Sequence, residues 1–169
     1  MPKIIENLEA RLIEEARKQI QESGYGTVTI RSVAKACGVG VGTVYNYFSS
    51  KEELVATHLL EDWNDSITVI RAVSKFSSAP RPVLLCIYDQ LRDYACRHEA
   101  IFRDETAAAA LAGSFSRYHA MLRSQLAEPL RKFCHSDFAA QFISEAILTW
   151  TMAGKAFDEI YSMMEKLFS

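Results

Sequence analysis

The chain has 169 residues, of which 49% are hydrophobic and 24% are charged. This composition is that of an ordinary globular protein and excludes a disordered chain. Its formal net charge of −2 at pH 7 excludes strong charge-driven binding to arbitrary DNA, because that affinity comes from neutralised phosphates. The longest stretch without a charged residue, 36–50, is rich in glycine and polar groups. A membrane span needs about 18 or more apolar residues, so none is expected.

The cysteines are few and widely spaced, at Cys37, Cys86, Cys96 and Cys134. No pair has CxxC spacing, and no signal peptide is expected. We therefore expect reduced thiols in a cytoplasmic protein.

The first predicted element is a helix over residues 2–23. Apolar residues recur there every three or four positions, with Glu-rich turns between them. The stripe consists of Ile5, Leu8, Leu12, Ala16 and Ile20. Gly24-Tyr25-Gly26 is expected to end the helix.

Residues 29–54 contain two further short helical patterns separated by a glycine. In the first, Thr29 stands at the N-cap position. Its buried face is expected to contain Ile30, Val33, Ala34 and Cys37. Gly38 supplies the positive φ that ends a helix at low cost.

The second short pattern is expected to bury Val44, Tyr47 and Phe48. Its remaining residues, Val41, Gly42, Thr43, Tyr45 and Asn46, are expected to project outward. Two helices joined by a short turn with glycine form a helix-turn-helix, whose second helix enters the DNA major groove.

The exposed side chains suit this use. Thr43 and Tyr45 carry hydroxyls for phosphate oxygens, Asn46 can pair bidentately with adenine, and Lys51 is a positive charge just beyond the second helix. The full set of candidate DNA-binding residues is Thr29, Arg31, Val41, Gly42, Thr43, Tyr45, Asn46, Tyr47 and Lys51.

This stretch resembles the signature of TetR-type transcriptional regulators. The resemblance rests on Thr29, Val33-Ala34, Gly38-Val39, Gly42, Val44-Tyr45, Tyr47-Phe48, Ser50-Lys51-Glu52 and Leu54. It implies that three N-terminal helices bind DNA, and that later helices bind a small molecule and dimerise. The chain departs from the pattern at Gly40, where the family usually has Ser or Thr, and at Cys37, where Ala is more usual.

Helical patterns also fill the remainder of the chain, and no strand pattern or repeat appears. We expect helices over 51–74, 83–98, 100–112 (ending at Gly113) and 115–126 (ended or kinked by Pro129). Ser136 or Asp137 is the expected cap of the next helix. Gly154 is expected to separate the last two helices, within 138–168. The predicted fold is all-α, with a DNA-binding domain over 1–50 and a ligand-binding and dimerisation domain over 51–169.

Aromatic side chains are frequent after residue 55. At helical spacing most aromatic residues belong to a core, but a mostly apolar cavity with a few polar groups is also how a small-molecule site is built. Because the resemblance implies such a pocket, the candidate lining residues are Trp63, Tyr88, Tyr94, Tyr118 and Trp150.

Two Cys/His pairs raise the question of a metal site: Cys96 with His98, and Cys134 with His135. Neither has the usual ligand spacing of tetrahedral zinc, so no metal or cofactor is expected. The sequence also contains no GxSxG, P-loop, HExxH or GxGxxG motif. An enzyme is therefore not expected.

The leading hypothesis is a dimeric repressor that binds a near-palindromic double-stranded DNA operator and is released by a small apolar or aromatic effector. The last two helices, 138–168, are expected to form the dimer. One alternative is a helical protein-interaction module that retains the helix-turn-helix only as a scaffold. The other is a Cys/His metal-binding protein or small helical enzyme.

Overall fold

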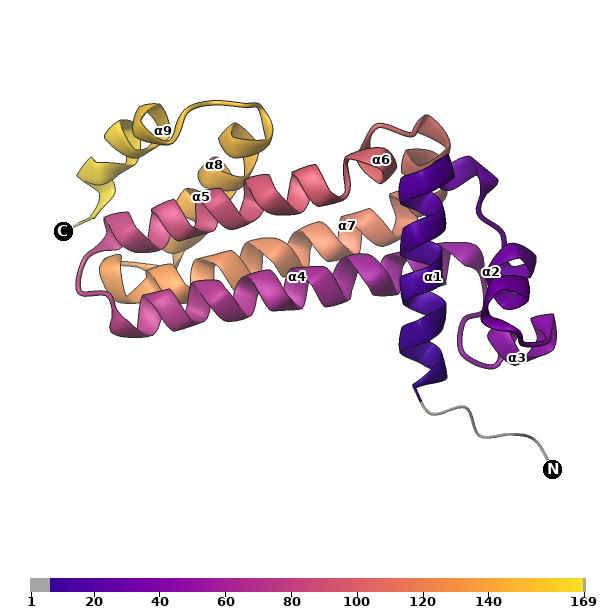
Figure 1. Cartoon of the computed structure of the whole chain (residues 1–169). Helices are drawn as coiled ribbons and strands as arrows, with labels where there is room; N and C mark the ends of the chain where they lie inside the picture. Colours follow the sequence, from indigo (N-terminus) through magenta and orange to yellow (C-terminus); the bar gives the residue numbers. More distant parts are fainter. Residues whose placement is uncertain (1–6, 169) are drawn as a thin grey trace. The chain divides into compact units, whose positions relative to one another are not determined.

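A computed structural model describes residues 7–168, apart from the side chains of 112–117. These residues form helices and contain no strand, which confirms the all-α prediction (Figure 1). The helices are α1 (Leu8–Ser23), α2 (Ile30–Cys37), α3 (Val41–Tyr45), α4 (Lys51–Phe76), α5 (Pro80–Arg97), α6 (Glu99–Phe102), α7 (Glu105–Ala127), α8 (Asp137–Met152) and α9 (Phe157–Met164). Short 3₁₀ turns cover Tyr25–Thr27, Glu128–Phe133 and Glu165–Leu167. None of the helices in the described part of the chain has the length and apolar character that crossing a bilayer requires.

The chain divides into two compact units. The first contains the residues up to Glu61 and His98–Ser114, and the second contains Asp62–Arg97 and the residues from Phe115 onward. Helices α4 and α7 each contribute residues to both units.

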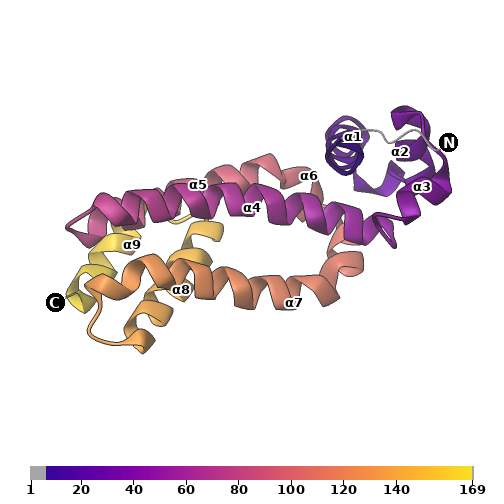
Figure 2. The same cartoon turned by 90° about the horizontal axis from the view of Figure 1, so that it is seen from below.

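The core of the first unit lies among its first three helices. Helix α1 packs against α2, and α2 packs against α3 (Figures 1 and 2). Leu12, Val33 and Val44, one from each of these helices, are fully buried. The apolar stripe of α1 is therefore buried against the helix-turn-helix.

The described part of α1 starts at Leu8, directly after Asn7, whose φ is 57°. Residues 2–6, which the sequence pattern places in the same helix, lie outside the described residues. The helix ends at Ser23 as predicted, because Gly24 adopts a φ of 81°.

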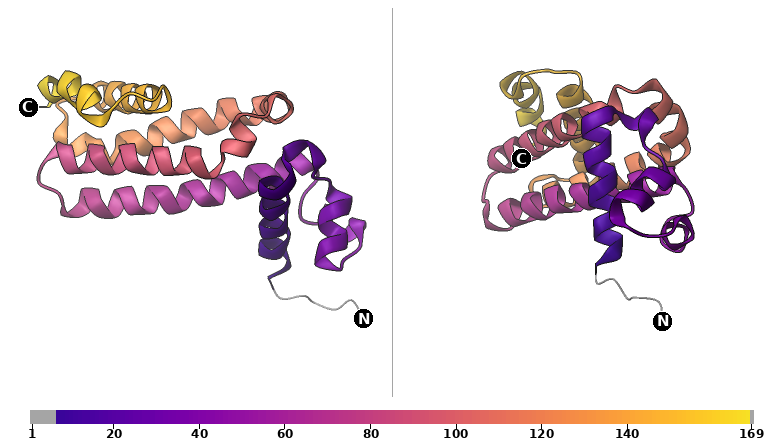
Figure 3. Two further views of the ribbon diagram at one scale, coloured as in Figure 1. Left: turned by 45° about the horizontal axis from the view of Figure 1, so that its top comes forward. Right: turned by 45° about the vertical axis from the view of Figure 1, so that its right-hand side comes forward.

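The second unit is built around α5. This helix buries Val83, Leu84 and Ile87 and packs against α8, which buries Ile143 and Ile147. Helix α9 lies beside both of them (Figure 3).

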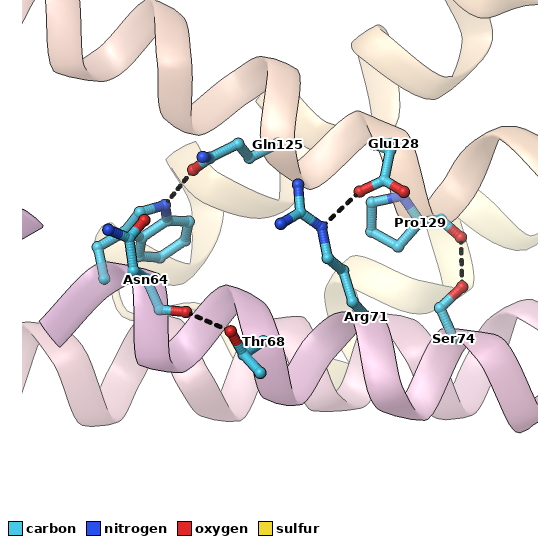
Figure 4. A network of polar contacts seen from close by, with 8 residues as sticks. Asn64, Thr68, Arg71, Ser74, Gln125, Glu128 and Pro129 are labelled. Atoms are coloured by element: carbon cyan, nitrogen blue, oxygen red, sulfur yellow. Dashed lines mark hydrogen bonds and ion pairs between the residues drawn. The ribbon is translucent and has the colours of Figure 1, made fainter. Parts of the chain in front are cut away.

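Polar contacts join the second half of α4 to the segment after α7 (Figure 4). Arg71 Nε donates to Glu128 Oε2 at 2.8 Å, and Ser74 Oγ donates to the Pro129 carbonyl at 2.8 Å. Lys132 Nζ donates to the carbonyls of Ser74 and Ser77, at the end of α4 and just beyond it. These contacts fix the end of α4 within the second unit.

The separate helices predicted over 100–112 and 115–126, and the predicted start at residue 83, are wrong. The helix expected over 100–112 does not end at Gly113, because α7 runs through this glycine to Ala127. A glycine inside a helix costs only about 1 kcal/mol relative to alanine, which Ala-rich flanks can absorb. The chain is interrupted earlier, where Asp104 Oδ1 accepts from the Ala107 N–H at 3.0 Å and so starts α7. Helix α5 begins at Pro80 rather than at residue 83.

The other helix ends follow the sequence signals. Helix α7 gives way to a 3₁₀ turn at Glu128, with Pro129 in its first turn. Ser136 caps α8 by accepting from the Ala139 N–H at 3.1 Å. Gly154 has a φ of 79° between α8 and α9, which confirms two C-terminal helices.

Candidate nucleic-acid interface

The start of α2 is held by a reciprocal cap. Thr29 Oγ1 accepts from the Ser32 N–H at 3.0 Å, and Ser32 Oγ accepts from the Thr29 N–H at 3.1 Å. Ser32 Oγ also donates to Gln19 Oε1 on α1 at 2.6 Å. The predicted N-cap is therefore confirmed, and it is fixed to the neighbouring helix as well.

The turn between α2 and α3 is held from two sides. Gly38 adopts a φ of 70° and ψ of 30°, and the Val39 N–H donates to the Ala34 carbonyl at 3.0 Å. These are the features of a glycine helix end. From α1, Arg11 Nη2 donates to the Cys37 carbonyl at 3.3 Å, a contact that the sequence pattern did not predict.

Helix α3 presents most of its surface outward. Val44 and Phe48 are buried, whereas Tyr45 is 53% exposed and Tyr47 is 44% exposed. The expectation that Tyr47 is buried is therefore wrong. Phe48 follows Val44 by one helical turn and fills the space in the small core, so that Tyr47 remains at the surface with its ring centre 6.5 Å from that of Phe48.

The N-terminus of α4 is also capped. Ser50 Oγ accepts from the Glu53 N–H at 3.2 Å, and Glu53 Oε2 accepts from the Ser49 N–H at 2.6 Å and from its hydroxyl at 2.5 Å. These bonds from Ser49, first from its side chain and then from its backbone, lower the pKa of Glu53. The carboxylate therefore remains charged and keeps this helix start in place.

A groove of about 580 Å³ lies where α2, α3 and α4 begin. It brings together five of the nine predicted DNA-binding residues: Thr29, Arg31, Val41, Tyr45 and Lys51. The other four do not line it: Gly42, Thr43, Asn46 and Tyr47. Of these, Gly42, Asn46 and Tyr47 are exposed and Thr43 is half-buried.

Six further residues line the groove that were not among the predicted DNA-binding residues: Gly26, Val28, Ile30, Ser49, Ser50 and Glu52. Ser50 and Glu52 belong to the motif that carries the family resemblance, and this was the available signal. Tyr25 donates its hydroxyl to Glu52 Oε1 at 3.4 Å. The pKa of Glu52 is lowered, chiefly by a hydrogen bond to its own backbone. The groove thus contains one anion together with the cations of Arg31 and Lys51.

Lys51 is half-buried beside Tyr25. Its Nζ donates to the Tyr25 carbonyl at 3.0 Å and lies 3.8 Å from the centre of the Tyr25 ring. The ammonium group is therefore held at the groove instead of moving freely in solvent.

Three of the candidate ligand-binding residues are associated in the second unit. Trp63 is buried, its Nε1 donates to Gln125 Oε1 at 2.6 Å, and its ring meets that of Tyr94 edge-on at 5.6 Å. Burial raises the pKa of Tyr94, with smaller contributions from Asp62 and Tyr118. Tyr94 therefore remains a neutral phenol.

The other two ligand candidates lie elsewhere in this unit. Tyr88 is buried, donates its hydroxyl to the Lys155 carbonyl at 3.0 Å, and packs against Phe157. Trp150 is 50% exposed and lines a groove of about 680 Å³ formed by α8 and α9. Phe142 and Met163 also line this groove, and Phe138 and Met152 are further exposed apolar side chains of α8.

The two Cys/His pairs have different surroundings. Cys96 is exposed, whereas His98 is buried with its ring 5.0 Å from that of His58. Cys134 is half-buried and His135 is exposed. Among the described residues, no cysteine belongs to a cluster of three metal-ligating side chains. Within the first unit, the ring nitrogens of His58 and His98 are two candidate metal ligands.

Known proteins are similar to the segment that contains this groove. The family model of bacterial regulatory proteins, tetR family, matches residues 12–57. The HTH-type transcriptional regulator UidR of Escherichia coli K12 is 30% identical over 61 residues, which are 36% of this chain and 31% of UidR. The HTH-type transcriptional regulator Rv1816 of Mycobacterium tuberculosis H37Rv is 34% identical over 68 residues, or 40% of this chain and 29% of Rv1816. The chain thus matches about a third of the length of these relatives.

Solved structures resemble a larger part of the chain. SCO7518 from Streptomyces coelicolor A3(2) has a TM-score of 0.72 at 14% identity, covering 95% of this chain and 97% of its own. The TetR family repressor AlkX from a Dietzia strain has a TM-score of 0.66 at 15% identity, covering 94% of this chain and 98% of its own. At such identities the likeness concerns the fold. Taken together, residues 12–57 match the family model of TetR-type bacterial regulators, and the fold of the chain is similar to that of solved TetR-type proteins.

Proposed function

We propose that this DNA-binding regulator is a repressor that occupies a near-palindromic operator as a homodimer and leaves it when a small apolar or aromatic molecule binds. The observation that carries the proposal is the groove that unites Thr29, Arg31, Val41, Tyr45 and Lys51 at the starts of three helices. Hydroxyl, cationic and apolar groups together match the phosphate and base contacts of a specific DNA site.

Each side chain has a role in this proposal. Thr43, Tyr45 and Lys51 bind phosphate, and Thr29 and Arg31 support them from α2. Val41 and Asn46 read bases. The exposure of Tyr47 supports its inclusion on the phosphate side, where its hydroxyl is a suitable donor.

The C-terminal helices are the proposed dimer interface. Phe142, Trp150 and Met163 are large apolar side chains at the surface of α8 and α9, and extended exposed apolar patches mark interaction sites. In a two-fold dimer the recognition helices enter successive major grooves about 34 to 36 Å apart, which requires a near-palindromic operator.

The effector is proposed to bind the second unit. Trp63, Tyr94 and Tyr118 supply an aromatic environment with a few polar groups, which suits a small apolar or aromatic molecule. Tyr88 and Trp150, which contact other parts of the unit, remain weaker candidates. An effector that prefers the conformation with the wrong half-site spacing releases DNA through a tilt of α4.

The proposal also divides the chain into a DNA-binding domain, 1–50, and a ligand-binding and dimerisation domain, 51–169. It places the protein in the cytoplasm. It assigns the protein no enzymatic activity.

The experiment that tests this function is the selection of random DNA duplexes by the purified protein, at several salt concentrations and with non-specific competitor DNA. Recovery of a near-palindromic sequence supports the proposal and supplies the operator for effector screening. Failure to select any sequence with folded, dimeric protein favours the protein-interaction module, and stoichiometric bound metal favours the Cys/His alternative.

A further inference from the structure

Lys51 contacts both the backbone carbonyl and the aromatic ring of Tyr25. The Lys51 ammonium donates to the Tyr25 backbone carbonyl at 3.0 Å and stands 3.8 Å above the centre of its ring. A cation over the face of an aromatic ring is attracted by the negative charge density of that face. The carbonyl fixes the position of Nζ, and the ring adds an attraction that depends on the side chain at position 25.

Tyr25 is itself held firmly. Its side chain is only 1% exposed, and it begins the 3₁₀ turn that follows Gly24, whose φ is 81°. The hydroxyl donates to Glu52 Oε1 at 3.4 Å. Burial, reinforced by Glu52, raises the pKa of Tyr25 to about 12. The ring is therefore a neutral and immobile surface for the lysine.

A lysine side chain is otherwise flexible and loses conformational freedom when it binds. Its ammonium group has three donors, and the Tyr25 carbonyl accepts only one of them. Because Lys51 lines the groove, an ammonium held by Tyr25 still has donors for a phosphate oxygen, and part of the ordering cost is met before DNA arrives.

We propose that Tyr25 is a positioning residue for DNA binding, whose ring holds the Lys51 ammonium at the phosphate-binding groove. The inference rests on the proposed function, because it requires Lys51 to bind phosphate. Tyr25 itself makes no contact with DNA in this arrangement.

The test is a double-mutant cycle on the selected operator, with Lys51→Ala, Tyr25→Leu, the double variant and the conservative variant Tyr25→Phe. Lys51→Ala is expected to reduce the slope of log affinity against log salt by about one per protomer. Tyr25→Leu is expected to weaken binding about 2- to 30-fold per protomer, the range that a cation–π contact can supply. Tyr25→Phe keeps the ring and is expected to bind within about twofold of the unchanged protein.

The decisive comparison is the effect of Tyr25→Leu in the Lys51→Ala background, where positioning predicts no further loss of affinity. An equal loss in both backgrounds would show that Tyr25 acts only through the core. Tighter binding by Tyr25→Leu would show that the ring withholds Lys51 from DNA. An unchanged salt slope in Lys51→Ala would instead show that Lys51 makes no phosphate contact. This result would contradict the proposed function, whereas the other outcomes test only the positioning role of Tyr25.

Leucine at a buried aromatic position can unfold the domain. A second series of variants therefore changes the charge density of the ring and leaves its size nearly the same. Phenylalanine with increasing fluorine substitution is placed at position 25, and folding is followed by thermal unfolding. Affinity is expected to fall stepwise as fluorine weakens the charge density of the ring face, and to stay constant in the Lys51→Ala protein. If affinity stays constant across the fluorine series in the protein that retains Lys51, the inference is overturned.

Discussion

Arg11 and Cys37 bind each other in both directions across the first two helices. Arg11 Nη2 donates to the Cys37 carbonyl at 3.3 Å, and the Cys37 thiol donates to the Arg11 carbonyl at 3.6 Å. Because Cys37 is the last residue of α2, the arginine satisfies a carbonyl that the helix end leaves without a partner. The contact connects α1 directly to the turn of the helix-turn-helix.

Replacing Arg11 by alanine is expected to lower the free energy of unfolding by about 0.5 to 1 kcal/mol, since a hydrogen bond from a charged group is weakened at an exposed site. Urea denaturation would measure the change. Lys18→Ala, an exposed substitution on the same helix, is the matched control and should leave stability nearly unchanged. Equal effects of the two substitutions would show that the contact contributes nothing.

Gly40→Ser is expected to stabilise the protein by a few tenths of a kcal/mol, because serine adds the side-chain cap that α3 lacks. The φ of Gly40 is −71°, and an added Cβ would lie 3.7 Å from Thr43 Oγ1, an ordinary contact. Gly38→Ser is the contrasting variant, because its φ of 70° strains a side chain by about 1 kcal/mol or more. Thermal unfolding should show a higher melting temperature for Gly40→Ser and a lower one for Gly38→Ser. A destabilising effect of Gly40→Ser would contradict the capping argument.

Asn46→Ala is expected to relax the base preference at one operator half-site position, at a cost of about 1 to 3 kcal/mol for the preferred base. Binding to a panel of operators with single base changes would measure this loss. The exposed Asn64→Ala, in the second unit, serves as the control. If discrimination is the same in both proteins, Asn46 does not read bases.

Cys96 is expected to be alkylated faster than the other three cysteines. Cys96 is exposed, whereas burial raises the pKa of Cys37, Cys86 and Cys134. A raised pKa means less of the reactive thiolate at a given pH, so alkylation of these three requires a higher pH than their unfolded forms do. Mass spectrometry of iodoacetamide-treated protein between pH 7 and 9, with urea-unfolded protein as reference, would establish the order. Faster alkylation of Cys37 than of Cys96 would contradict it.

Trp150→Glu and Met163→Glu are each expected to shift the dimer towards monomer by at least tenfold in dissociation constant. A buried charge without a partner is strongly unfavourable in an interface, and both side chains lie on the proposed surface of α8 and α9. Sedimentation velocity over a concentration range would measure the shift. Phe76→Glu, at an 83% exposed position outside this groove, is the control, and a similar shift there would argue against the assigned interface.

Local sequence signals determined the helix-turn-helix and the break between α8 and α9. The cap at Thr29, the left-handed turn at Gly38 and the end of a helix at Gly154 all follow from conformational preferences of single residues and their neighbours. Such preferences act over a few residues, so they could be inferred without knowledge of the rest of the chain.

The tertiary structure decided the features that depend on competition for space or on distant partners. The sequence pattern predicts that both Tyr47 and Phe48 are buried in the small core. Only the packing shows that Phe48 occupies it and Tyr47 does not. Gly113 resembles a helix end, yet the helix continues through it. Lys51 and Tyr25 are separated by 26 positions, and no periodicity relates them. Spacing along a helix identifies which residues share a face, whereas the free energy of burial determines which of them the fold encloses and which of them meet.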